Sequence, residues 1–145
     1  MDILNVLEKA TQINSVSGSE NEIRKFISDN VKKYCDELLV DAMGNLIAHK
    51  KGSGKKIMFA AHMDEIGIIV TDIDDKGFVR FSSVGGLNLR NLVNLRVRFA
   101  NGVEGVIGAE EESFKDKPAI SKLYVDLGAA DKKEAEKTVS IGDTA

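Results

Sequence analysis

The chain has 145 residues, a formal net charge of −3, and 43% hydrophobic residues, which is enough for one domain or two small ones with a real core. The acidic balance argues against a nucleic-acid partner, and no apolar run approaches the roughly 18 residues of a membrane span. Asp2 in the first residues does not fit a secretory signal, and one cysteine, Cys35, excludes an internal disulfide. We therefore expect a cytoplasmic protein that binds neither nucleic acid nor a membrane.

The first third of the chain predicts two helices. Apolar residues recur at helical spacing at Ile3, Leu4, Leu7, Ala10 and Ile13. Ser19 precedes Glu22 by three residues, the spacing of a capping box, and predicts a second helix that continues to Tyr34. The loop before it, residues 17–19, lacks the strand and the flanking glycines of a nucleophile elbow, so we interpret it as a helix-entry loop.

Three strands are expected next. Residues 38–41 and 46–50 flank a glycine turn at Gly44, which is typical of a hairpin. After a second turn, the apolar run Ile57-Met58-Phe59-Ala60-Ala61 predicts a strand that ends at His62 and Asp64. The carboxyl ends of strands are where an open α/β sheet presents its chemistry, so this edge is the candidate site.

His62 and Asp64 form the candidate pair. Residues two apart on an extended segment point the same way, so both side chains could face one site. Imidazole is a common zinc ligand, and a nearby carboxylate fixes its tautomer and raises its basicity. From spacing alone the alternative is a hydrogen-bonded structural histidine. The other histidine, His49, lies in a basic turn and is interpreted as a surface residue.

After Asp64 the hydrophobic period changes from 3.6 to 2. Turn signals at residues 74–77 and at Asn101-Gly102 separate alternating segments, and glycines permit tight bends. This pattern predicts a small barrel or sandwich. Glu110, Glu111 and Glu112 belong to a polar run and are interpreted as a solvated face rather than catalytic carboxylates. The expected strands are 65–71, 78–81, 93–99, 103–109 and 123–127, with a short helix at 131–137.

The segment AHMDEIG at residues 61–67, followed by IIVTDIDDKGFVRFSSVGG and GVEGVIG, resembles the tetrahedral aminopeptidase family. These dinuclear metallopeptidases are also labelled glutamyl aminopeptidases and CelM-type endoglucanases. The resemblance implies an α/β fold, in which the N-terminal part of a peptidase α/β/α domain is followed by an inserted small β-barrel or sandwich domain. Residues 1–64 would be the opening, incomplete part of the catalytic domain. Residues 65–145 would be a lid and oligomerisation domain.

The same resemblance implies chemistry. The parent protein would hydrolyse N-terminal residues from peptides, using two divalent metal ions, most simply zinc or cobalt, and would form a homo-oligomer. His62 would be a metal ligand, and Asp64 its carboxylate partner in catalysis. The other ligands and a general-base glutamate would follow the region that matches residues 141–143. We therefore expect this chain to be an N-terminal fragment that is inactive alone and holds metal weakly.

Two alternatives remain open at this point. The chain could be a non-catalytic β-module whose main property is self-association. It could also share the endoglucanase label of the family, but glycoside hydrolysis needs two carboxylates flanking the scissile bond, and no such pair is evident.

Overall fold

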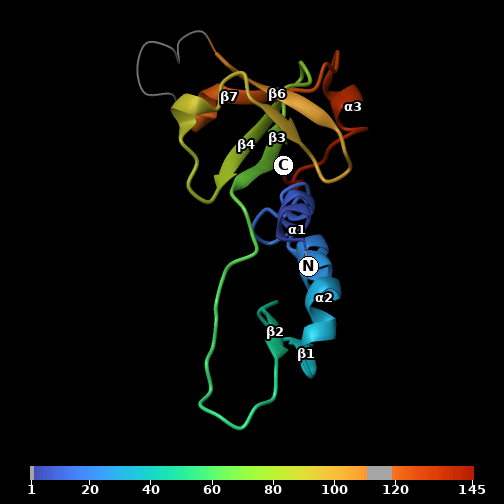
Figure 1. Cartoon of the computed structure of the whole chain (residues 1–145). Helices are drawn as coiled ribbons and strands as arrows, with labels where there is room; N and C mark the ends of the chain where they lie inside the picture. Colours follow the sequence, from blue (N-terminus) through green and yellow to red (C-terminus); the bar gives the residue numbers. More distant parts are fainter. Residues whose placement is uncertain (1, 111–118) are drawn as a thin grey trace. The chain divides into compact units, whose positions relative to one another are not determined.

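The computed structural model describes residues 2–110 and 119–145 of a mixed α/β chain (Figure 1). The chain divides into two compact units, Met1–Asp64 (unit 1) and Glu65–Ala145 (unit 2). The elements of unit 1 are α1 (Ile3–Ala10), α2 (Asn21–Val31), the 3-10 turn η1 (Lys32–Tyr34), β1 (Glu37–Val40) and β2 (Leu46–His49). Those of unit 2 are β3 (Gly67–Ile73), β4 (Val79–Val84), η2 (Leu89–Asn91), β5 (Arg96–Arg98), β6 (Glu104–Ala109), η4 (Ile120–Lys122), β7 (Leu123–Asp126) and α3 (Lys132–Ala135).

Both helices of unit 1 form where apolar residues recur at helical spacing. Asp2 caps α1, accepting hydrogen bonds from the backbone amides of Leu4 and Asn5 at 3.1 and 3.3 Å. The N-cap of α2 is Glu20 and not Ser19, so the expected capping box is wrong by one residue.

Among the described residues, no helix is long and apolar enough to cross a membrane.

The hairpin expected in unit 1 is present. β1 and β2 pair antiparallel, from Glu37 opposite His49 to Val40 opposite Leu46. The carboxylate of Asp41 holds the turn by accepting from the backbone amides of Met43 and Asn45, both at 2.9 Å. The turn also needs a residue with positive φ, and Gly44 supplies it with φ of +85°.

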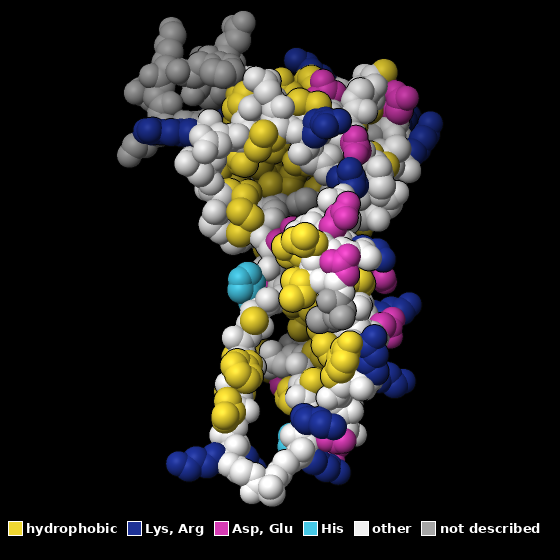
Figure 2. All heavy atoms as spheres, viewed as in Figure 1, with side chains coloured by type: hydrophobic (Ala, Val, Ile, Leu, Met, Phe, Trp, Pro, Cys, Tyr) yellow, Lys and Arg dark blue, Asp and Glu magenta, His cyan; other side chains and the backbone are white. Residues whose placement is uncertain are grey.

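The expected strand at residues 57–61 is not formed. Ile57, Met58 and Phe59 are 78%, 87% and 95% exposed, and no hydrogen bond joins this run to another described segment. A strand needs a neighbour that accepts and donates its ladder bonds, and apolar composition alone does not provide one. As a result, hydrophobic side chains lie exposed along the connection that follows β2 (Figure 2).

Unit 2 is built on one curled antiparallel sheet with strand order β3-β4-β7-β6-β5. The barrel or sandwich expected from the sequence thus takes the form, in the described strands, of a single five-stranded sheet. The turn at residues 74–77 joins β3 to β4, with Gly77 at φ of +83°, as expected. At the outer edge of β3, Ile69 bridges to Thr144, so the end of the described chain pairs with this strand.

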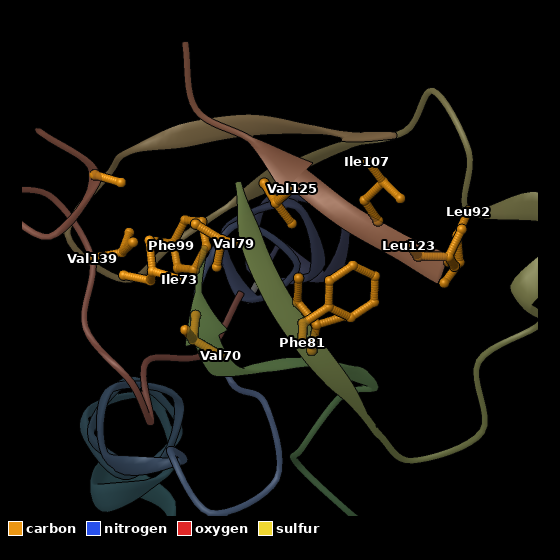
Figure 3. Packing of buried hydrophobic residues seen from close by; sticks show 12 residues of the cluster. Val70, Ile73, Val79, Phe81, Leu92, Phe99, Ile107, Leu123, Val125 and Val139 are labelled. Carbon is orange, nitrogen blue, oxygen red and sulfur yellow. The ribbon is translucent and has the colours of Figure 1, made fainter. Parts of the chain in front are cut away.

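The core of unit 2 lies inside the curl of the sheet. Figure 3 shows Phe81, Ile107, Leu123 and Leu92 gathered at one end, and Phe99, Ile73, Val79 and Val139 at the other. The alternation of β3, β4, β6 and β7 explains this, because every second side chain faces the interior. The buried cluster consists of Ile68, Val70, Ile73, Val79, Phe81, Leu92, Phe99, Ile107, Leu123, Val125, Ala135 and Val139.

One ion-pair network ties together parts of unit 2 that are distant in sequence. Arg80 on β4 pairs with Asp74 at 3.1 Å and with Glu110 at 3.0 Å, and Glu110 also pairs with Lys122 at 2.9 Å. The side chain of Glu110 is still 38% exposed, as expected for a solvated face, but it is also held by two ion pairs that the sequence did not predict. The rest of that polar run, residues 111–118, lies outside the described residues.

The burial pattern predicts different costs for two leucines of unit 2. Leu123→Ala should lower the free energy of unfolding by about 2–5 kcal/mol, because Leu123 is fully buried and its loss leaves a cavity. Leu95→Ala makes the same chemical change at a side chain that is 50% exposed, and should cost less than about 1 kcal/mol. Urea unfolding followed by circular dichroism measures both. Equal losses in the two variants would contradict the packing described for β7.

Candidate functional site

Two polar side chains of unit 1, those of Ser17 and His62, meet at the carboxylate of Asp64. Ser17 Oγ donates a hydrogen bond of 2.5 Å to Asp64 Oδ2. His62 Nδ1 lies 3.1 Å from Asp64 Oδ1 and 2.9 Å from the backbone carbonyl oxygen of Asp64. The two oxygens of one carboxylate are therefore each engaged by a different partner.

A tight turn presents Ser17 to this carboxylate. The amide of Ser19 donates to the carbonyl of Val16 at 2.7 Å, and Gly18 has φ of +91°, the geometry of a type II turn with Ser17 as its second residue. The carboxylate of Glu20 accepts from the Gly18 amide at 2.5 Å. Val16 is buried, with 1% exposure, which anchors the start of the turn.

His62 lies at the end of the extended connection that includes residues 57–61. Both groups facing its Nδ1 are acceptors, so Nδ1 carries the proton and Nε2 is left with a free lone pair. The side chain of His62 is 86% exposed, and that of Asp64 is 35% exposed. The imidazole is thus oriented by its own neighbour and turns an unprotonated nitrogen toward its surroundings.

The hydrogen bonds to Asp64 favour its charged form. The Ser17 hydroxyl, and after it the His62 imidazole, hold the pKa of the Asp64 carboxyl below its ordinary value. An ionised carboxylate is a stronger acceptor than a neutral one, which reinforces the bond to His62 Nδ1.

This arrangement is not a serine–histidine–aspartate triad. In a triad the histidine accepts the proton of the nucleophilic hydroxyl, whereas Ser17 bonds to the carboxylate of Asp64. Instead the pair has the geometry of a metal-binding histidine with its carboxylate partner. In residues 2–110 and 119–145, no group of three or more histidine, cysteine or acidic side chains could hold a metal ion. The site thus offers one imidazole with an unprotonated nitrogen, and the described residues around it do not make up a full set of metal ligands.

The structure brings together His62 and Asp64, as their spacing predicted, although their roles stay predictions. The other histidine, His49, lies in the hairpin, 3.2 Å from Glu37 and well exposed. Sequence reasoning missed Ser17 as a partner of Asp64. The two residues are 47 positions apart, and a serine–glycine turn carries no local signal for such a contact.

Comparison with known proteins gives a consistent result. Residues 44–145 match the model of a peptidase family described as M42 glutamyl aminopeptidase. A proposed aminopeptidase of Acetivibrio thermocellus is 53% identical over 146 residues, covering 99% of this chain and 44% of that protein. The chain thus spans less than half the length of this relative.

Solved structures agree in fold. The TET1 peptidase of Pyrococcus horikoshii, which can assemble into a tetrahedron or a large octahedral shell, is 37% identical with a TM-score of 0.82. A structure named as an endoglucanase of Thermotoga maritima is 39% identical with a TM-score of 0.85. They cover 99% and 95% of this chain, but the chain covers only 46% and 43% of theirs.

The environment of Asp64 predicts a specific titration. Its carboxyl 13C signal should have a midpoint below the ordinary pKa of an aspartate, because Ser17 and His62 bond to the ionised form. The stability that these bonds give is present above the ordinary pKa and is lost as the pH falls through the lowered one. His62→Ala should raise the midpoint yet leave it below the ordinary value, since the larger contribution from Ser17 remains.

His49→Ala is the matched control and should leave the Asp64 midpoint unchanged, because His49 contacts Glu37 instead. A wild-type midpoint at or above the ordinary value of an aspartate would contradict the hydrogen bonds described here.

Proposed function

Because the chain belongs to the M42 glutamyl aminopeptidase family, we propose that it forms the N-terminal part of a metal-dependent aminopeptidase that removes N-terminal residues from peptides. The observation that carries this proposal is the His62–Asp64 pair, in which Nδ1 is bonded to a carboxylate and Nε2 is free. That is the arrangement of a metal-binding histidine with its outer partner.

Each unit takes one role in this proposal. Unit 1 is the opening part of the catalytic domain, with residues 57–61 as a strand whose neighbours come from the remainder of the fold. Unit 2 is an inserted β domain, a small barrel or sandwich in the complete protein, that closes the active-site chamber and carries subunit contacts. Support comes from the exposed apolar run in unit 1 and from the separate core of unit 2.

His62 and Asp64 have different roles in the proposed site. When bound, a pair of divalent metal ions, zinc or cobalt in the simplest case, polarises the scissile carbonyl and lowers the pKa of a water molecule. His62 would hold one ion through Nε2. Asp64 holds the imidazole in the tautomer that leaves Nε2 free and balances positive charge near it. The general-base glutamate and the other ligands would come from residues beyond those of this chain.

The endoglucanase label of one solved neighbour does not favour glycoside hydrolysis here. That reaction uses two carboxylates placed on either side of the glycosidic bond. In the cluster of Ser17, His62 and Asp64 there is a single carboxylate, and it is already engaged by both of its neighbours. The pair of imidazole and carboxylate fits metal-assisted hydrolysis better.

We expect this 145-residue chain alone to show no hydrolysis of aminoacyl p-nitroanilides. A chimera in which it is continued by the C-terminal remainder of the Acetivibrio thermocellus relative should show chelator-sensitive hydrolysis, because it completes the ligand set. His62→Ala in the chimera should lower kcat/KM by roughly 100-fold or more, since losing a ligand costs at least as much as losing an outer-shell partner.

The matched control in the chimera is His49→Ala, which removes the hairpin histidine and should leave kcat/KM within about twofold. Turnover by the chain alone, or a fully active chimera carrying His62→Ala, would contradict the proposed role of His62. Cellulose hydrolysis by the chimera with no aminopeptidase activity would favour the endoglucanase alternative.

A second proposal concerns assembly: we infer that unit 2 carries contacts between copies of the chain. Apolar side chains on its surface support this, among them Val106 on the outer face of β6, 42% exposed. The TET1 peptidase, similar in fold, assembles into shells. Symmetric dimers are the commonest closed assembly.

Light scattering at high protein concentration should therefore give a mass above that of one chain. Val106→Lys should shift the distribution toward monomer, because it places a charge in an apolar contact. Ser82→Lys adds the same charge at an exposed polar position of β4 and should leave the mass unchanged. A single monomer peak for the wild-type chain would contradict assembly through unit 2.

A further inference from the structure

We propose that Ser17 is a positioning residue, whose hydroxyl fixes the rotation of the Asp64 carboxylate so that Oδ1 stays on His62 Nδ1. Ser17 Oγ bonds to Oδ2 at 2.5 Å while Oδ1 faces the imidazole at 3.1 Å. Its relevance to catalysis rests on the proposed function, in which the free Nε2 of His62 is a metal ligand.

Ser17 acts by restricting the rotation of the Asp64 carboxylate. Without a partner on Oδ2, the Asp64 carboxylate is held only through Oδ1, and rotation about its Cβ–Cγ bond, which has a broad energy profile, samples more orientations in which neither oxygen faces Nδ1. A hydrogen bond from a hydroxyl to an ionised carboxylate is short and strong. Ser17 therefore selects, for Asp64, the orientation that also serves His62.

The turn makes this selection effective. Ser17 is the second residue of a type II turn that is closed between Val16 and Ser19 and held by Glu20. The turn requires positive φ at Gly18, and a Cβ added there would meet no atom within 4 Å. A side chain at position 18 would therefore disturb the turn only by straining the backbone, and not by a steric clash. Such a substitution moves Ser17 while its hydroxyl is retained.

The effect of losing Ser17 is partial for a structural reason. His62 Nδ1 also faces the backbone carbonyl oxygen of Asp64, at 2.9 Å, and this acceptor does not depend on Ser17. Removing the hydroxyl loosens the carboxylate but leaves one acceptor in place. The ratio of the Nδ1–H tautomer to the Nε2–H tautomer should therefore fall by about twofold to tenfold, the range that a hydrogen bond of ordinary net strength supports.

The test is 15N NMR of the imidazole nitrogens in the full 145-residue chain, at a pH where histidine is neutral and with no metal or substrate added. The chain has only two histidines, so His49, which contacts Glu37, is an internal reference. Wild-type His62 should show a protonated Nδ1 and an unprotonated Nε2. Ser17→Ala should shift both His62 signals toward the other tautomer and leave those of His49 unchanged.

Two further variants separate positioning from a general structural effect. Ser17→Thr keeps the hydroxyl at a turn position that accepts β-branched residues and should restore the wild-type signals. Gly18→Ala keeps the hydroxyl but strains the turn, and should shift His62 in the same direction as Ser17→Ala. Unchanged His62 signals in Ser17→Ala, with the His49 signals intact, would overturn the proposal. So would failure of Ser17→Thr to restore them.

This result is distinguishable from that of the aminopeptidase test. The tautomer is measured without metal, substrate or the remainder of a longer protein. An inactive chimera together with the expected tautomer shift would leave Ser17 as the residue that orients Asp64 and would reject only the catalytic use of the pair.

Discussion

The backbone of residues 57–61 has no strand to pair with in the described chain, and the candidate site lies at the end of this segment. Each unpaired amide and carbonyl must be solvated, and Ile57, Met58 and Phe59 stay exposed. Burying such a side chain stabilises a fold by about 1.5–3 kcal/mol. In the proposed function, strands from the remainder of the catalytic domain pair with this backbone and bury these side chains. The same strands would also fix the position of His62.

The two units differ in how much they depend on such a remainder. Unit 2 closes its own core around Leu123 and Val125, both with 0% exposure, and its network at Arg80 joins β4 to Glu110. In unit 1 the site joins the turn at Ser17 to the end of the connection at Asp64, and the apolar residues 57–59 of that connection stay exposed. In the proposed function, the Ser17–Asp64–His62 cluster would preorganise one metal ligand, and the other ligands would come from elsewhere in the longer fold.

Local chemistry determined which parts of this structure could be predicted. The turn with Gly77, between two alternating segments, identified the β3–β4 hairpin, and Asp131 before Lys132 marks the start of α3. Pairing of the run that begins at Ile57 was not predictable, because a strand depends on partners that its own sequence does not encode. The spacing of His62 and Asp64 is local and was informative. The contact of Ser17 with Asp64 depends on how the chain returns over 47 positions, and no residue pattern reports it.

In the proposed function, residues 57–61 form a strand that leads into the site and takes its ladder hydrogen bonds from strands of the longer fold. Hydrogen exchange of these amides, measured in the 145-residue chain and in the chimera, tests it most directly. We expect near-unprotected exchange in the chain alone and roughly 100-fold or greater protection in the chimera, with the amides of β4 and β7 protected in both. Strong protection of residues 57–61 in the chain alone, or none in the chimera, would contradict it.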